Sequence, residues 1–188
     1  VFSVDGGRPI PITLRYNSLL NQGSRHFSPG WAHDYEATIS GDPNGVVNVN
    51  LDSTRRIRFQ ASSGNYTAID EAGRYDRLTR ASNAFTYVRR DGSIYEFDTA
   101  NRLRRLGNKV RQFLEFSYNQ FGELIEIKEP IANRILKVEP RRNRSGAIQY
   151  IVDQEDRIVY FSYDTTGRLT AIHPAATLTP QPITNFIT

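Results

Sequence analysis

The sequence predicts an all-β protein in which antiparallel β-hairpins stack side by side into a curved sheet or strip. Short runs alternate apolar and polar residues at every second position, and clusters of turn-forming residues separate the runs. One turn unit also returns at a nearly constant interval, which indicates a repeat architecture. An isolated hairpin is only marginally stable, so we expect each unit to pack against its neighbours.

The alternating segments are rich in β-branched and aromatic residues, as half-buried strands are. They are 12–16, 47–51, 57–59, 85–87, 114–118 and 159–163. Turn-forming clusters occur at 42–45, 63–65, 91–92, 119–122, 145–146 and 164–167. Asp91-Gly92 predicts a tight hairpin, because both residues tolerate the positive φ of such a turn. Between 68 and 84 the pattern is ambiguous, since Asp70-Glu71 and Arg77-Leu78 could each start a short helical turn.

Three segments share one turn unit: FDTANRL at 97–103, YNQFGEL at 118–124 and YDTTGRL at 163–169. The second gap is about twice the first, so we expect a degenerate copy between them, with Pro140 at its aromatic position and two extra turn residues. In each unit the aromatic ring packs on the sheet, Asp or Asn accepts backbone N–H groups, and Gly supplies a positive φ. Each repeat is thus predicted to be one β-hairpin.

The strand that follows each turn returns to the core at Leu106, Ile127, Ile151 or Ile172. Leu124 and Ile127 are three residues apart and cannot share a face of a regular strand. We therefore expect a β-bulge at this point, or a turn that extends through the leucine.

Composition limits the chemistry. The chain of 188 residues can bury a sizeable core, and it has no cysteine, which excludes disulfides, thiolate metal sites and a cysteine nucleophile. It also has no methionine, so we expect a fragment of a longer protein. Neither a membrane span nor a signal peptide is predicted, because no long apolar run occurs and the first residues lack the signal-peptide pattern.

The chain carries a formal net charge of +4, most of its bases being arginines. Arginine doublets occur at 55–56, 89–90, 104–105 and 141–142. Adjacent side chains of a strand point to opposite faces, so doublets do not form a one-sided basic stripe. We interpret them as solvated surface with local ion pairs and expect no nucleic-acid partner, since the net field is weak.

The repeat resembles a known family. The unit Y-D-x-x-G-R-L resembles the YD repeat of Rhs proteins, of the Tc-toxin cocoon component and of teneurins, and its best match is Tyr163, Asp164, Gly167, Arg168 and Leu169. PITLRYNS at 11–18, followed by FSPGWAHDYEATI at 27–39, is similar to the segment that opens the Rhs repeat region. With DGSIYEFD at 91–98, the resemblance covers most of 10–174 and suggests the N-terminal part of the repeat region.

The resemblance implies a long β-strip that spirals, in complete members, into a hollow shell enclosing a toxic C-terminal domain. We expect an Rhs/YD-repeat region over 1–174, with an opening segment at 1–90 and hairpin repeats at 91–174, and a tail or linker at 175–188. Fewer than about twenty strands are too few to close a large cage. Pro140 and Arg141 replace Tyr and Asp in the third copy, which suggests an irregular or edge unit.

The resemblance therefore implies a secreted, exported or cell-surface scaffold segment rather than an enzyme, contributing to a shell that encapsulates or presents a toxin or effector. The expected partners are other parts of the same repeat protein or its toxin domain, with self-association through exposed edge strands as a further expectation. The alternative is an extracellular module that binds carbohydrate or a cell surface. No catalytic residue, cofactor or metal ligand is assigned.

Trp31 is the only tryptophan, in a Pro-Gly turn with aromatic neighbours. Core packing is the favoured interpretation and a sugar-stacking platform is the alternative. His33, Asp34 and Glu36 suggest a metal or acid–base cluster, but in a continuous strand His33 projects one way and both acids the other, so we expect no convergence. The remaining histidines are His26 and His173. The acids at 70–71 and 153–156 are interpreted as solvated turn residues rather than a calcium site.

Overall fold

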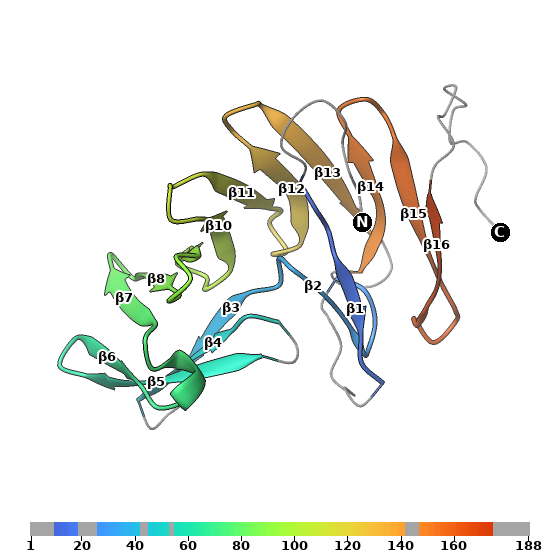
Figure 1. Ribbon diagram of the computed structural model, residues 1–188. Helices are drawn as coiled ribbons and strands as arrows, with labels where there is room; N and C mark the ends of the chain where they lie inside the picture. Colours follow the sequence, from blue (N-terminus) through green and yellow to red (C-terminus); the bar gives the residue numbers. More distant parts are fainter. Residues whose placement is uncertain (1–9, 19–25, 42–44, 53–54, 142–146, 175–188) are drawn as a thin grey trace.

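The computed structural model describes residues 10–18, 26–41, 45–52, 55–141 and 147–174 (Figure 1). These residues form β-strands β1 to β16 and one short 3-10 helix, η1, so the predicted all-β class is confirmed. The strands pair antiparallel in sheets of two, four and ten strands. Within this described part, no helix is long and apolar enough to cross a membrane.

The first two sheets come from the N-terminal part of the chain. The two-stranded sheet consists of β1 (Leu14–Tyr16) and β2 (Trp31–His33). The four-stranded sheet consists of β3 (Thr38–Gly41), β4 (Val46–Asn50), β5 (Arg56–Ser62) and β6 (Asn65–Ala68). Helix η1 (Glu71–Gly73) then leads into the third sheet.

The ten-stranded sheet is a meander in which every strand after β7 pairs with the strand before it. Its strands are β7 (Arg77–Ala81), β8 (Ala84–Val88), β9 (Ile94–Phe97), β10 (Leu103–Gly107), β11 (Phe113–Tyr118), β12 (Leu124–Glu129), β13 (Arg134–Pro140), β14 (Ile148–Asp153), β15 (Ile158–Tyr163) and β16 (Leu169–Pro174). The sheet follows a curve from β7 to β16 (Figure 1). This is the predicted strip of stacked hairpins.

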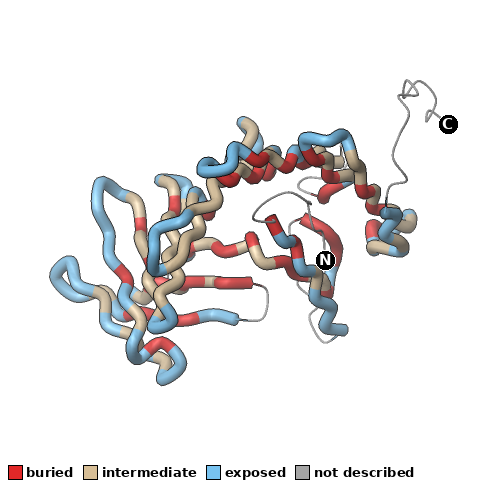
Figure 2. Tube along the Cα trace, turned by 45° about the horizontal axis from the view of Figure 1, so that its top comes forward, coloured by how far each residue is buried: buried red, intermediate tan, exposed pale blue. Residues whose placement is uncertain are grey.

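The part of the opening segment around β2, residues 26–39, lies on the concave side of this curve. Figure 2 shows buried residues along the arc of the ten-stranded sheet and along the N-terminal segment beside it. The ring of Phe27 lies 4.9 Å from that of Phe161, measured between centroids, and Tyr35 lies 5.2 Å from Phe116. A single apolar core thus joins residues of the opening segment to the strands of the repeats.

The ambiguous region contains one helical turn and one strand. Helix η1 starts at Glu71, so the helical turn predicted at Asp70-Glu71 is present. The one predicted at Arg77-Leu78 is wrong, because strand β7 starts at Arg77. Leu78 is 2% exposed and pairs with Tyr87 on β8, so burial of its side chain favours a strand over a helical turn at this point.

The bulge expected near Leu124 is present. Tyr118 pairs with Leu124 and Ser117 with Glu126, which leaves Ile125 as the extra residue. The shift turns Leu124 and Ile127 to the same face, and their side chains are only 2% and 1% exposed.

Candidate functional site

The hairpin turns of the repeats share one hydrogen-bond pattern. The Oδ1 atom of Asp98 accepts the backbone N–H groups of Ala100 and Arg102, both at 2.9 Å. Asn119 and Asp164 accept the equivalent N–H groups in the second and fourth units. The residue three positions after each acceptor has a positive φ: 63° at Asn101, 79° at Gly122 and 84° at Gly167. The predicted roles of Asp or Asn and of Gly in the turn are therefore confirmed.

The same turn recurs at the opposite ends of the strands, and the sequence analysis did not predict the one at Asn108. Asn108 accepts the N–H groups of Val110 and Gln112, and Asp153 accepts those of Glu155 and Arg157. The positive φ falls on Arg111 and Asp156, with values of 58° and 57°. These two turns contain no glycine at the position of positive φ, and glycine is the residue that usually indicates such a turn in a sequence. Residues 153–156 are therefore turn residues, as interpreted, but Asp153 is 9% exposed and not solvated, because its carboxylate faces the backbone N–H groups of the turn and Arg157.

The degenerate third copy occupies its expected place. Pro140 pairs with Ile148 and Glu139 with Tyr150, which is the register shift of the other three units. Ile148 therefore stands at the leucine position of this copy. Most of its turn, 142–146, lies outside the described residues. The expectation of an edge unit is wrong, because β13 lies between β12 and β14 and completes the pairing of both.

Tyrosines link successive repeats. The hydroxyl of Tyr118 donates a hydrogen bond of 2.8 Å to the carbonyl oxygen of Leu103, and that of Tyr163 donates one of 2.6 Å to the carbonyl oxygen of Ile148. In each pair the first residue of one unit bonds the last residue of the unit before it. An arginine covers each ring: Arg102 lies 4.6 Å from the centroid of Tyr118, and Arg141 lies 5.1 Å from that of Tyr163. Burial raises the pKa of both hydroxyls above the ordinary tyrosine value.

The opening segment bonds the leucine positions of the repeats. The N–H of Ile148 donates to the carbonyl oxygen of His26 at 2.7 Å, and the N–H of Leu169 donates to Oγ of Ser28 at 3.0 Å. These two residues occupy equivalent positions in the third and fourth units, directly after the shifted register. At these two positions the register shift interrupts the hydrogen bonds between paired strands, and the opening segment supplies the acceptors for the backbone N–H groups.

The first repeat is joined to the four-stranded sheet in a similar way. The N–H of Ile39 donates a 3.0 Å hydrogen bond to the carbonyl oxygen of Asn101, and Thr38 forms an isolated bridge with Arg102. Segment 26–39, which contains most of the opening-region resemblance, therefore contacts the first, third and fourth repeats through its backbone or a short side chain.

Trp31 is half-buried and packs against the apolar core, so the predicted core packing is confirmed for part of its side chain. Its ring is 5.2 Å from that of Tyr16, which is 61% exposed, and the two planes are tilted by 48°. A cavity of about 380 Å³ opens beside them, lined by Tyr16, Ser18, Ser28, Pro29, Gly30, Trp31, Arg168 and Leu169. Gly30 has a φ of 86°, and a Cβ there would lie 2.7 Å from the Tyr16 ring, so the close approach requires glycine.

His33 and Glu36 converge, contrary to the expectation. Strand β2 ends at His33 and the chain turns at Asp34, so the alternation of a continuous strand does not reach Glu36. Nε2 of His33 lies 3.4 Å from Oε1 of Glu36 and 2.6 Å from Nδ1 of His26. Asp34 does point away, and it binds Arg15 and the N–H of Thr13.

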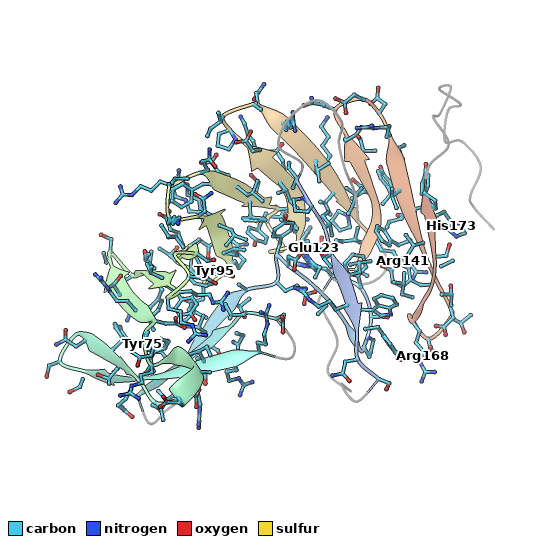
Figure 3. The ribbon with its side chains drawn as sticks, viewed as in Figure 1. Tyr75, Tyr95, Glu123, Arg141, Arg168 and His173 are labelled. Carbon is cyan, nitrogen blue, oxygen red and sulfur yellow. The ribbon has the colours of Figure 1, made fainter. Side chains whose placement is uncertain are left out.

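Burial lowers the pKa of His33 well below the ordinary histidine value, and the nearby His26 and Arg15 lower it further. Tyr35 donates its N–H to Nδ1 of His33 at 3.3 Å. His173 is separate from this group: it lies on β16, where Nε2 is 2.9 Å from Oγ of Ser162 (Figure 3).

Local ion pairs account for several members of the arginine doublets, as predicted. Arg55 pairs with Asp52 at 2.8 Å and Arg89 with Asp91 at 2.8 Å. Arg105 lies between Glu96 and Glu115, at 3.4 Å and 3.3 Å.

Together, the turns, tyrosine links and opening-segment contacts define an all-β hairpin strip with a docked N-terminal segment. No protein-family model and no curated protein matches the chain.

Proposed function

We propose that this chain is a structural segment of an Rhs-type YD-repeat protein, and that it contributes to a secreted or cell-surface β-shell that encapsulates or presents a toxin or effector domain. The observation that carries the proposal is the identical register shift in four successive hairpins, at the YD-like units and at their degenerate copy. A strip built from one repeated hairpin, with the same register shift in each copy, can be extended by adding further hairpins.

The placement of the aromatic rings supports a scaffold. Phe59 and Tyr87 are both fully buried, with ring centroids 6.0 Å apart, and they join the four-stranded sheet to the ten-stranded one. Phe27 and Tyr35 fill the concave side in the same way. Rings used as filling between layers stabilise a wall, whereas ligand recognition requires rings on an accessible face.

We further propose that the opening segment closes the concave side at one end of the strip. Here the inner face of the repeats is already covered by the chain itself, through Phe27 on Phe161 and Tyr35 on Phe116. The space for an enclosed domain would then lie beyond β16, the terminal strand of the described sheet. Further repeats of the same protein are the partner that this edge would pair with.

Electron cryomicroscopy of the protein in its natural full-length context tests this function. We expect the strip to form part of a continuous β-wall around a separate domain, with β16 paired to a following strand. An isolated strip with nothing enclosed, or a β16 edge covered by an unrelated fold, would contradict the proposal. Turnover of a substrate that depends on residues of this segment would overturn its structural assignment.

A carbohydrate-binding module is the second candidate, and the surface around Trp31 favours it. Tyr16 and Trp31 present adjacent rings beside a cavity that Arg168 also lines, and its guanidinium can donate to sugar hydroxyls. Figure 3 shows Arg168 in the turn before β16.

A glycan array with competition by free sugar tests this second function. Tyr16→Ala should abolish retention, whereas Tyr75→Ala should not, since Tyr75 is similarly exposed but lies near η1, away from this cavity (Figure 3). Equal retention by both variants would exclude the surface around Trp31 as the binding site.

A further inference from the structure

We propose that His26, His33 and Glu36 form a binding site for a divalent transition-metal ion of the zinc type, which fastens the opening segment into one conformation. The three residues each offer one ligand atom, and these atoms all lie within 4.8 Å of one another. Two imidazole nitrogens and one carboxylate oxygen form a ligand set that Zn²⁺ accepts.

Two of the three ligand-atom distances lie within about 1 Å of the values that a bound ion requires. Zinc binds nitrogen and oxygen at about 2.0–2.2 Å, so tetrahedral ligand atoms lie roughly 3.4 Å apart. The separation of His33 Nε2 from Glu36 Oε1 is 3.4 Å. His26 Nδ1 and His33 Nε2 are 2.6 Å apart, and they would separate by less than about 1 Å to admit the ion.

The burial of the cluster favours an ion over a solvated ion pair. His26 is 8% exposed and His33 is 1% exposed, while the side chain of Glu36 is 8% exposed. An ion bound between these atoms would be shielded from bulk water.

The tautomer of His33 must change when the ion binds, and the ion must make up for the contacts that change removes. Because Tyr35 donates its N–H to Nδ1, the proton of the neutral ring lies on Nε2 and points toward His26 in the absence of an ion. Metal binding through Nε2 moves that proton to Nδ1. Two contacts are lost: the 2.6 Å contact between the two imidazoles, which two metal–ligand bonds replace, and the longer 3.3 Å contact from the N–H of Tyr35.

The site lies where an ion would reinforce docking of the opening segment. The carbonyl of His26 accepts the N–H of Ile148 at 2.7 Å, and Phe27 packs on Phe161. His33 ends β2 and Glu36 precedes β3. An ion at this point would therefore join the loop that contacts β14 to the connection between the two N-terminal sheets.

Zinc titration of the untagged, EDTA-dialysed protein tests the proposal. By calorimetry we expect one Zn²⁺ per chain, and a melting temperature raised by roughly 5–10 °C when free Zn²⁺ is a hundredfold above Kd. Glu36→Gln and His26→Gln should weaken the affinity at least tenfold and remove most of the thermal shift. His173→Gln, which changes a histidine of β16, should leave both unchanged.

A spectroscopic measurement on the unchanged protein covers the case in which a variant fails to fold. Co²⁺ should give the intense visible absorption of a tetrahedral nitrogen and oxygen site, and Zn²⁺ should remove it. Absence of stoichiometric binding, undiminished affinity in Glu36→Gln, or stability that follows pH but not Zn²⁺ would each overturn the metal site. None of these outcomes affects the scaffold proposal, which rests on the repeats.

Discussion

The hydroxyl of Tyr163 donates its hydrogen bond to the carbonyl oxygen of Ile148, the residue at the leucine position of the preceding repeat. Tyr118 makes the equivalent bond to Leu103. Phe97 and Pro140, the first residues of the other two units, have no hydroxyl to donate. The link thus occurs between units one and two and between units three and four, so the repeats are joined in pairs by side chains.

Removal of a linking hydroxyl should destabilise the protein. Tyr118→Phe and Tyr163→Phe each leave a partly buried carbonyl without its donor, so we expect a loss of about 1 kcal/mol in the free energy of unfolding per site. Urea denaturation followed by tyrosine fluorescence measures it. Tyr75→Phe is the control, since Tyr75 is 69% exposed, and a loss of equal size there would contradict the role of the link.

The positive φ of the turns predicts that removing a glycine from one turn and introducing a glycine into another have opposite effects on stability. Gly167→Ala should cost about 1 kcal/mol, because alanine is strained at a φ of 84°. Arg111→Gly should be neutral or stabilising by up to about 1 kcal/mol, because Arg111 already adopts a φ of 58°. Thermal unfolding of the two variants provides the comparison. Destabilisation by Arg111→Gly would show that contacts of the arginine side chain stabilise the fold by more than the backbone strain at its positive φ destabilises it.

Two turn aspartates predict a loss of stability in acid. The backbone N–H of Arg168 and the hydroxyl of Thr166 lower the pKa of Asp164, and the hydrogen bond from Arg58 lowers that of Asp70. A depressed folded pKa contributes stability that is fully present above the ordinary aspartate value of 3.8. That contribution is lost as pH falls through the lowered value.

Urea midpoints measured between about pH 6 and pH 2 test this acid dependence. The double variant Asp70→Asn, Asp164→Asn should show a flatter decline below about pH 4 than the unchanged protein. Asn119 occupies the equivalent turn position in the second repeat, so asparagine keeps the acceptor oxygen there. An unaltered slope would assign the acid sensitivity to other carboxylates.

Ser28 should stabilise docking of the opening segment. It is 3% exposed, and its Oγ accepts the N–H of Leu169 at 3.0 Å. Ser28→Ala leaves that N–H unpaired, so we expect a loss of about 1–3 kcal/mol and faster amide exchange at Leu169. Ser62→Ala, at an exposed position of β5, should have little effect. Unchanged exchange at Leu169 would show that the bond does not hold the segment in place.

The terminal strand β16 should mediate self-association of the isolated chain. The prediction that Ile172 returns to the core is wrong, because the residue lies on the terminal strand and is 40% exposed. One edge of this strand has no partner strand among the described residues. Ile172→Lys should lower concentration-dependent association in sedimentation velocity. Ile131→Lys, at a 71% exposed position between β12 and β13, is the matched control. Association that both variants reduce equally would indicate general hydrophobic contact instead of edge pairing.

Local features of the fold could be read from the sequence because they depend on neighbouring residues. The turn at Asp164 needs an acceptor side chain and a glycine three positions later, and both stand in the sequence. The bulge near Leu124 followed from two apolar residues spaced three apart. The turn at Asn108 escaped notice because Arg111 takes the positive φ that glycine normally signals.

The sequence by itself determined the all-β class, the hairpin repeat and the position of the degenerate copy at Pro140, because period and turn chemistry act over a few residues. Only the tertiary structure decided that Ser28 meets Leu169 and that His33 meets both His26 and Glu36. Those meetings depend on where strand β2 ends and on which face of the curved sheet the opening segment covers. Packing between residues distant in the chain sets both, and no local pattern encodes them.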